Sequence, residues 1–270
     1  MKLRVIYSPG RNAFENMAYD EALMTGVRHG LPITMRLYSW RPPGFSLGYF
    51  QPYSDVDLEA CKKMGIDIVR RPTGGRGILH DQELTYSVIM PIPAGKEGSL
   101  LNTFKYINKG LLAGLSLLGI DAALVPRSSG SMARRATGTA ACFSSPSSYE
   151  VQVNGKKLLG SAQFRKDGIL AQHGSLPIKL DREKLFACII HDSNQQKEEN
   201  IRSAYEHMTC IEEILGKPVS WKKVADALVQ GVSREWNLNI EICEPEDFEE
   251  ELMKKLLKIK YSNPDWSKRR

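Results

Sequence analysis

Apolar residues recur at helical spacing from residue 99 to residue 118, and this is the clearest hydrophobic pattern in the chain. Spacings of three and four place such residues on one face of an α-helix. Gly119, directly after the pattern, favours a helix end at that point. The positions that define the face are Leu101, Phe104, Ile107, Leu111, Leu115 and Leu118.

Shorter apolar and alternating runs predict strands in the first third of the chain. They lie at residues 3–8, 34–38, 45–50, 66–71 and 84–90. Two further helices are expected among these strands. One begins after Asn12, which stands at capping-box distance from Glu15, and the other covers residues 55–64 before Gly65.

Asn154 and Gly155 are a clear hairpin signal, because Asn-Gly is a preferred pair for a type I′ turn. The flanking residues 149–153 and 156–165 are therefore expected to pair as antiparallel strands. Residues 169–178 follow as a third strand after a second turn.

A two-residue turn also determines which side chains share a face of this hairpin. Gln152 is then opposite Lys157, and Glu150 is opposite Leu159. Lys157 is expected on the polar face, which is the expected side for a cleft. The other residues of that face are Glu150, Gln152, Ser161 and Gln163, whereas the apolar face carries Tyr149, Val151, Val153 and Leu158.

The last third of the chain is predicted to be helical. The expected helices lie at residues 182–189, 211–215, 221–236 and 248–259, with a polar linker at residues 194–199. Hairpins followed by helices indicate an α+β protein with a mixed, largely antiparallel sheet, flanking helices and a helical C-terminal segment. We expect residues 1–180 to form the core and residues 181–270 to pack on it within the same domain.

The composition narrows the class of protein. With 42% hydrophobic and 25% charged residues, the chain is typical of soluble globular proteins. Its first residues lack the apolar stretch of a signal peptide, and no apolar run reaches the length of a membrane span. The five cysteines include no Cys-x-x-Cys pair, so no zinc site is indicated, and a cytoplasmic location with free thiols is expected. The net charge of +6 attracts acidic partners, but it does not choose among nucleic acid, anionic membranes and acidic carrier proteins.

A glycine-rich segment between two predicted strands is the first candidate binding site. Adjacent glycines let the backbone approach a ligand closely, and their N–H groups can point at an anion or a carbonyl. The preceding arginines add fixed positive charge and planar donors, so the segment suits a carboxylate or a phosphate. A plain turn is an equally open interpretation, and the segment is neither a Walker A loop nor a Rossmann fingerprint. Its candidate residues are Arg70, Arg71, Thr73, Gly74, Gly75, Gly77 and His80.

Cys142 and Lys157 are candidate reactive residues. Cys142 lies in a long segment, residues 127–148, that is rich in small and polar residues, whereas the other four cysteines stand in predicted helices or strands. Such a loop gives a thiol the access that a nucleophile needs. Lys157 can lower the pKa of a nearby thiol by its charge and can exchange protons with an attacking amine. An inert thiol and a solvated lysine are the alternatives for each residue taken singly.

Small residues and a histidine extend this candidate site along the hairpin. Gly160, Ser161 and Ala162 in mid-strand favour close approach of a ligand or another backbone. His173, followed by Gly174, stands on the neighbouring strand, where it can act as a base or an orienting donor, or can satisfy a buried hydrogen bond.

Taken in order, these motifs resemble those of the lipoate-protein ligase and octanoyltransferase family. The motifs are RRPTGGRGILHDQELTYSV, a cysteine-bearing loop, GKKLLGSAQFR and QHGSL. The resemblance runs from Asn12 to about residue 180 and is greatest to the octanoyltransferase type of Gram-positive bacteria. Four separated motifs in one order make it specific.

The resemblance implies the fold of the biotin and lipoate ligase catalytic domain, with residues 1–180 as the acyltransferase core. It implies that the segment from Arg70 to His80 lines an acyl and phosphate tunnel. It also implies that Lys157 is the active-site lysine and that Cys142 is the acyl-thioester nucleophile.

The implied activity is transfer of an octanoyl group from octanoyl-acyl carrier protein, through a cysteine thioester, to a lysine of a lipoyl-domain protein such as glycine cleavage H protein. No metal is implied, and no cofactor beyond the phosphopantetheine that the donor carries. We expect no nucleic-acid or membrane partner, and a monomer.

Three other functions stay open on the sequence alone. An ATP-dependent lipoate-protein ligase would use the same pocket, although Arg76 stands where the glycine run of such ligases usually has a third glycine. A lipoyl-carrier amidotransferase would use the same cysteine and lysine. An RNA-binding Arg-Gly module would need neither, and no aromatic stacking platform flanks the segment.

Overall fold

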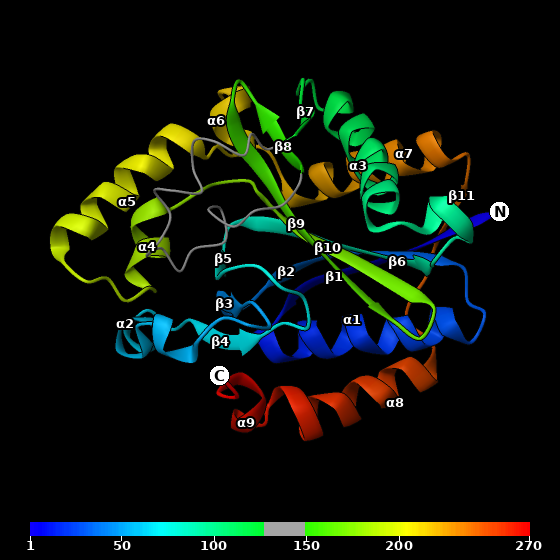
Figure 1. Cartoon of the computed structure of the whole chain (residues 1–270). Coiled ribbons are helices and arrows are strands. Elements are labelled where there is room, and N and C mark those ends of the chain that lie inside the picture. The colour runs from blue at the N-terminus through cyan, green and yellow to red at the C-terminus, as the bar shows by residue number, and fades with distance from the viewer. Residues whose placement is uncertain (127–148) are drawn as a thin grey trace.

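A mixed eight-stranded sheet forms the centre of the molecule in the computed structural model, which describes residues 1–126 and 149–270. Its strands are β1 (Lys2–Arg11), β2 (Ile33–Trp40), β6 (Glu83–Pro91), β7 (Ala123–Pro126), β8 (Tyr149–Val153), β9 (Lys156–Lys166), β10 (Ile169–Pro177) and β11 (Asn239–Ile242). They are ordered β11-β1-β2-β6-β10-β9-β8-β7 (Figure 1). β11, β1 and β2 are parallel, and each later pair of neighbours is antiparallel. The expected α+β class with a largely antiparallel sheet is therefore confirmed.

A second sheet of three short strands carries the glycine-rich segment. Its order is β4 (Asp67–Arg70), β3 (Gly44–Leu47), β5 (Ile78–His80), and the glycine-rich residues connect β4 to β5. Phe45 and Leu47 of β3 are buried in a small core of their own. The helices that complete this core are α2 (Leu58–Lys63), α4 (Arg182–Ala187) and α5 (Asn194–His207).

Helices cover both faces of the main sheet (Figure 1). α1 (Ala13–Arg28) and α8 (Asp247–Leu256) lie on one face, and α3 (Leu100–Leu117) and α7 (Trp221–Trp236) lie on the other. The remaining short elements are η1 (Tyr53–Asp55), η2 (Gly95–Gly98), α6 (Ile211–Leu215), η4 (Leu257–Tyr261) and α9 (Pro264–Ser267).

Two helix boundaries predicted from the sequence are confirmed, the start of α1 and the end of α3. The Asn12 side chain accepts a hydrogen bond from the Glu15 backbone N–H at 2.9 Å, and Glu15 accepts one from the Asn12 N–H at 3.3 Å. This capping box starts α1. α3 ends at Leu117, and Gly119 adopts a φ of 81°, which glycine tolerates best.

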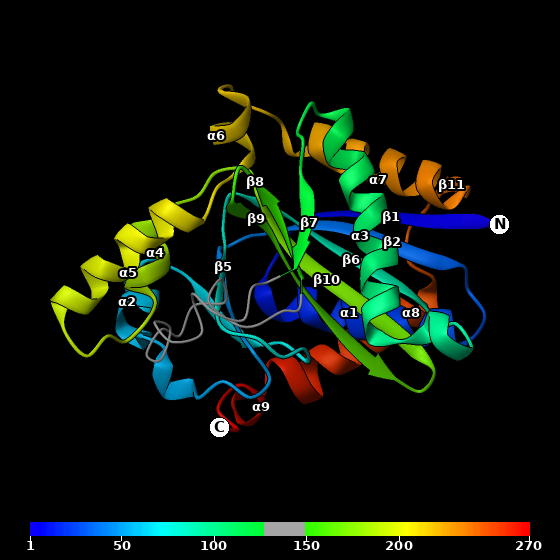
Figure 2. The same ribbon diagram turned by 45° about the horizontal axis from the view of Figure 1, so that its top comes forward.

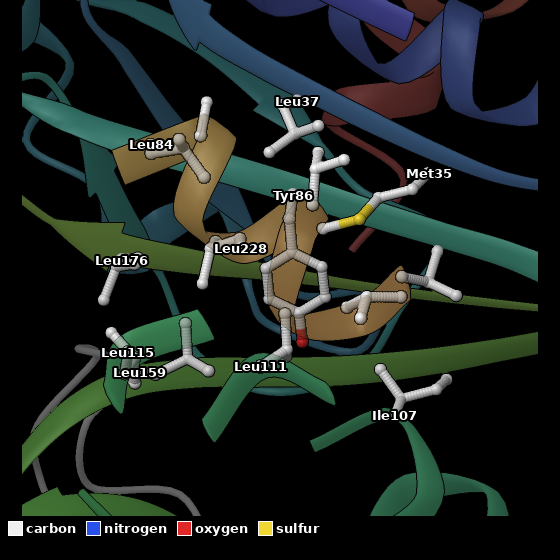
Figure 3. Close-up of a cluster of buried hydrophobic side chains, with 14 of the residues drawn as sticks. Met35, Leu37, Leu84, Tyr86, Ile107, Leu111, Leu115, Leu159, Leu176 and Leu228 are labelled. Carbon is white, nitrogen blue, oxygen red and sulfur yellow. The ribbon is translucent and has the colours of Figure 1, made fainter. Parts of the chain in front are cut away.

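The main core lies between the sheet and the pair α3 and α7. Ile107, Leu111 and Leu115 of α3 are buried there, together with Leu228 of α7, as Figure 3 shows around Tyr86. The two helices cross closely through glycines. A Cβ atom added at Gly231 would lie 2.0 Å from the Gly114 nitrogen, so only glycine fits at this crossing.

The hairpin is formed as predicted except for its register beyond the turn. Asn154 and Gly155 have φ angles of 49° and 75°, as a type I′ turn requires, and Gln152 is opposite Lys157. The expected pairing of Glu150 with Leu159 is wrong, because Val151 is opposite Leu159. A β-bulge at this point adds one residue to β9, because Leu158 lies between the pairs Val151–Leu159 and Gln152–Lys157 without a partner of its own on β8.

The second half of the chain differs from expectation in two places. Residues 194–199 are not a linker but the start of α5, which Ser193 caps through a hydrogen bond from the Gln196 N–H. Residues 239–242 form β11, so the segment after residue 180 also supplies a strand to the main sheet. The proposed division at residue 180 stays a prediction.

Candidate active site

A cavity of about 390 Å³ opens between the main sheet, the small sheet and the N-terminal end of α3. This volume is in the range of small-molecule sites in enzymes. It brings together ten residues predicted as functional. They are Arg71, Gly74, Gly75, His80, Lys157, Gly160, Ser161, Ala162, His173 and Gly174.

Part of the cavity wall is apolar. It includes Met17 of α1, Trp40 of β2, and Leu100, Leu101 and Phe104 from the first turns of α3. The apolar face predicted for α3 therefore contributes to both the core and the cavity. Its later residues pack into the core, whereas Leu101 and Phe104 line the cavity. Such a wall suits a hydrocarbon chain.

Lys157 lies in a polar part of the wall, on β9. Its ammonium nitrogen is 3.2 Å from Oε1 of Glu150, and both side chains are almost fully buried. Burying an ammonium costs free energy unless a carboxylate compensates it, and Glu150 supplies that compensation. Tyr149 also lines the cavity, although it was expected on the apolar face away from Lys157.

A chain of buried hydrogen bonds runs beside the cavity. His173 Nε2 is 2.7 Å from Thr73 Oγ1, and Thr73 Oγ1 accepts from the Arg71 Nε at 3.1 Å. Arg71 also donates to the Ser46 carbonyl at 2.7 Å, and Ser46 Oγ is 2.8 Å from Nε2 of His80. The network therefore holds both candidate histidines in fixed orientations.

His80 is fixed on its other side as well. Its Nδ1 is 2.8 Å from Oε1 of Glu83, and its ring stacks on Trp40 at a centroid distance of 4.0 Å. Thr85 and Ser175 also donate hydrogen bonds to the Glu83 carboxylate. Three elements therefore converge on this one buried carboxylate.

His173 borders a buried ion pair. Asp20 of α1 accepts from the Arg36 guanidinium at 3.0 Å, and its Oδ2 is 3.6 Å from His173 Nδ1. Burial lowers the pKa of His173, against the opposing pull of Asp20. Burial alone would raise the pKa of Asp20, but its hydrogen bond with His173 and the charge of Arg36 keep that pKa below its ordinary value. At neutral pH the site therefore contains a neutral imidazole beside an ionised carboxylate.

Arg71 gives the glycine-rich loop its shape. Its guanidinium donates to the carbonyls of Gly74 and Arg76, each at 2.8 Å, so that the loop curls around this one side chain. Gly75 has a φ of 93°, a conformation that side chains disfavour. A Cβ atom at Gly48, after β3, would lie 1.8 Å from the Gly75 carbonyl oxygen, so the two loops touch backbone to backbone.

Three predicted binding residues do not line the cavity. Arg70 is fully buried and donates to the carbonyls of Gly48, Gln51 and Ser267. Thr73 reaches the site through its hydrogen bonds with His173 and Arg71. Gly77 lies against the ring of Phe45, where a Cβ atom would come within 2.2 Å.

Cys142 lies outside the described residues, so its predicted role is untested. Of the described cysteines, Cys61, Cys188 and Cys210 are buried, Cys243 is half-buried, and none of the four lines the cavity.

Several residues of the site carry no signal in the sequence. Asp20 is one polar position among many on α1, and Trp40 reads as the end of a strand. Glu83 could have been noticed, because it stands three residues after His80 across a turn.

Metal-ligand groups and membrane-spanning helices are both absent from the described part of the chain. Residues 1–126 and 149–270 contain no group of three or more histidine, cysteine or acidic side chains placed to hold a metal ion. No helix within those ranges combines the length and the apolar character that a membrane crossing needs. The cytoplasmic location and the monomeric state expected from the sequence stay predictions.

The α+β fold surrounds a partly apolar cavity with a buried lysine in its wall, as a small-molecule catalytic domain does. The chain belongs to the lipoyl protein ligase A/B catalytic domain family, whose model matches residues 12–233. An octanoyltransferase LipM of Kyrpidia tusciae is 41% identical to it over 271 residues, which cover 99% of this chain and 98% of that protein. An octanoyltransferase LipM of Clostridioides difficile is 38% identical over 275 residues, with the same coverage.

Solved structures of ligases share the fold. A bipartite lipoate protein ligase from Thermoplasma acidophilum superposes with a TM-score of 0.83 at 24% identity, covering 99% of this chain and 96% of that one. A lipoate-protein ligase A bound with ATP superposes with a TM-score of 0.81 at 25% identity, covering 99% of each chain. The expected ligase-like fold and family are thus confirmed.

Proposed function

We propose that the protein is an octanoyltransferase. It takes an octanoyl group from octanoyl-acyl carrier protein, holds it as a thioester on Cys142, and delivers it to a lysine of a lipoyl-domain protein. The observation that carries the proposal is that Lys157 lines a cavity together with several apolar side chains. The octanoyltransferase relatives, similar over nearly the whole chain, support the acyl group and the reaction.

Different residues of the cavity are expected to bind different parts of the acyl donor. The acyl chain lies along Leu101 and Phe104, and the thioester carbonyl lies near Lys157. Backbone N–H groups of Gly74 and Gly75 are candidates to stabilise the oxyanion that forms during transfer.

The reaction runs in two steps. The Cys142 thiolate attacks the donor carbonyl, and the pantetheine sulfur leaves and takes up a proton. The amine of the acceptor lysine then attacks the acyl-cysteine and loses a proton, with Lys157 assisting, and the Cys142 sulfur leaves. An amide forms in the second step, so transfer needs no ATP. Ping-pong kinetics are the expected signature.

The chain on either side of residues 127–148 supports Cys142 as the nucleophile. Pro126 of β7 pairs with Tyr149 of β8, and Tyr149 lines the cavity. Seven residues of extended chain span at most about 25 Å, which limits how far Cys142 can lie from Tyr149. Cys142 is therefore within chain reach of a residue that lines the cavity.

Intact-protein mass spectrometry tests the proposal. Incubation with octanoyl-acyl carrier protein is expected to add one octanoyl group to the wild-type chain and none to Cys142→Ala. Cys243→Ala is the matched control, because this half-buried thiol lies outside the cavity, and it is expected to acylate normally. An octanoyl adduct that persists on Cys142→Ala would reject Cys142 as the nucleophile.

The same measurement separates the rival functions. Transfer from free octanoate with ATP, and none from the carrier thioester, would instead identify an ATP-dependent ligase. Transfer only from an octanoylated lipoyl-domain protein would identify an amidotransferase.

A further inference from the structure

The last residues of the chain form a basic surface beside the glycine-rich loop. Lys268, Arg269 and Arg270 are exposed, and Asp265 is the one acidic residue between positions 264 and 270. Phe50, in the loop after β3, is 67% exposed in the same region. We call this the C-terminal arginine surface, made by Tyr49, Phe50, Trp266, Lys268, Arg269 and Arg270.

Aromatic rings hold the two arginines in place. The Arg269 guanidinium carbon lies 4.6 Å from the ring centroid of Tyr49 and 4.8 Å from that of Trp266. The Arg270 guanidinium carbon lies 5.0 Å from the ring of Phe50. Across the described ranges, neither guanidinium forms an ion pair with a carboxylate. Stacking of this kind orders a charged group while its donor edges stay available.

Positive charge accumulates around this surface. Arg70 lies beneath it, and its guanidinium donates to the Ser267 carbonyl at 2.8 Å. Burial lowers the pKa of Arg70, and the charges of Arg269, Arg270 and Arg71 lower it further. Four guanidinium groups are thus close enough to interact, and two of them are exposed to a partner.

The surface is continuous with the rim of the cavity. The Tyr49 N–H donates to the Thr73 carbonyl at 2.8 Å, and Gly48 contacts Gly75 directly. Gly74 and Gly75 line the cavity. The loop that carries Tyr49 and Phe50 therefore lies directly against the glycine-rich loop that lines the cavity.

We propose that the C-terminal arginine surface binds the protein body of the acyl donor, a small acidic carrier whose phosphopantetheine arm enters the cavity over Gly74 and Gly75. The inference rests on the proposed function and adds the place where its donor binds. Acidic helices of a carrier complement the arginines, and Phe50 offers an apolar contact within the charged rim. We assign the surface to the acyl donor rather than to the acceptor, because the phosphopantetheine arm of the donor carries a negatively charged phosphodiester. The lysine side chain of the acceptor carries no anion that the glycine-rich loop could bind.

The test compares two donors that share the reacting thioester. Octanoyl-acyl carrier protein presents the carrier body, and octanoyl-pantetheine lacks both the body and the phosphate. In the double variant Arg269→Glu/Arg270→Glu, the KM for octanoyl-acyl carrier protein is expected to rise about tenfold or more, with kcat nearly constant. The KM for octanoyl-pantetheine is expected to change far less. Added salt should weaken wild-type affinity for the carrier more than that of the variant.

A matched control reverses the same charge elsewhere. Lys223→Glu/Arg234→Glu alters two exposed residues of α7, on the side of the molecule away from the C-terminus in both Figure 1 and Figure 2. Its KM for the carrier is expected to stay within about twofold of the wild type.

Each remaining outcome overturns the inference in a distinct way. An equal rise in KM for both donors would place the arginines in the acyl site itself. Normal acylation with slower transfer from preformed acyl-enzyme to the lipoyl domain would assign the surface to the acceptor. Unchanged kinetics with lost binding of a single-stranded RNA oligonucleotide would assign it to nucleic acid. A wild-type chain that neither donor acylates would instead refute the proposed function, and this inference with it.

Discussion

The ion pair between Lys157 and Glu150 is the most consequential contact of single residues in the site. Its two side chains come from adjacent strands and lie 3.2 Å apart with little exposure. A buried carboxylate stabilises the ammonium and fixes its position at the cavity wall. A cationic group held in this way can favour a thiolate nearby and can later exchange a proton with an incoming amine.

Lys157→Ala is expected to slow formation of the acyl-enzyme by about 10²–10⁴-fold at neutral pH. Loss of the positive charge raises the pKa of the Cys142 thiol, so less thiolate is present. Part of the rate should therefore return as the pH is raised. The measurement is the rate of octanoyl addition by mass spectrometry between pH 7 and about pH 9.

Lys156→Ala is the control for this prediction. Lys156 is the neighbouring residue on β9, but its ammonium donates to the Tyr205 carbonyl outside the cavity. The Lys156→Ala variant is expected to be acylated at the wild-type rate. A Lys157→Ala chain that reacts as fast as the control would remove Lys157 from the mechanism.

Two adjacent arginines illustrate what could not be predicted from the sequence. Arg70 and Arg71 carry the same chemistry at successive positions, and both were assigned to ligand binding. Successive side chains of an extended backbone point to opposite sides, so only one of the two could face the cavity. Which one does depends on the C-terminal segment that Arg70 binds, and this segment lies nearly 200 residues away in sequence.

At the scale of elements, the glycine-rich loop depends on a second loop for its shape. The residues after β3 contact it through Gly48, whose missing side chain lets the Gly75 carbonyl approach. The position of the cavity rim is therefore set jointly by two loops of the small sheet.

Gly48→Ala is expected to destabilise the protein by about 1–3 kcal/mol, because the added methyl group overlaps backbone that cannot rotate away. Acylation should fall as well, since the rim shifts. Urea unfolding followed by circular dichroism measures the first effect. Gly74→Ala is the stability control, because a Cβ atom there would meet no heavy atom within 4 Å. Equal unfolding midpoints for the two variants would contradict the close contact.

Long elements with strong local signals were predictable, and short or purely polar ones were not. The N-terminal cap of α1 and the apolar face of α3 are local patterns, so the start of α1 and both ends of α3 agree with expectation to within a residue or two. α5 has Ala204 as its one buried residue, so its sequence shows no apolar stripe, and its first turn looked like a linker. The bulge at Leu158 of β9 also lacks a local signal, because the flanking residues alternate no differently from those of a regular strand.

At the scale of the whole molecule, a buried ion pair joins the first strand to α8 near the end of the chain. Arg4 of β1 donates to Glu249 of α8 at 2.9 Å, and the two side chains are 4% and 0% exposed. Since α8 packs on α1 rather than on the small sheet, this pair fixes the C-terminal helices to the core.

Glu249→Ala is expected to cost about 3–5 kcal/mol of unfolding free energy, because it leaves the Arg4 charge buried without its carboxylate. Glu251→Ala, an exposed position on the same helix, should stay within about 0.5 kcal/mol of the wild type. Equilibrium urea denaturation compares the two. A Glu249→Ala loss no larger than that of Glu251→Ala would mean that Arg4 finds another partner.

The placement of β11 affects how the protein is made. Its four residues pair with β1 more than 230 positions earlier, and they cover the outer edge of that strand. On a translating ribosome, β1 emerges first and must wait for almost the entire polypeptide before this neighbour arrives. Until then, an unpaired edge that contains Leu3 and Val5 is exposed to other nascent chains. Newly synthesised copies are therefore expected to fold in higher yield when chaperones are present or when expression is slow.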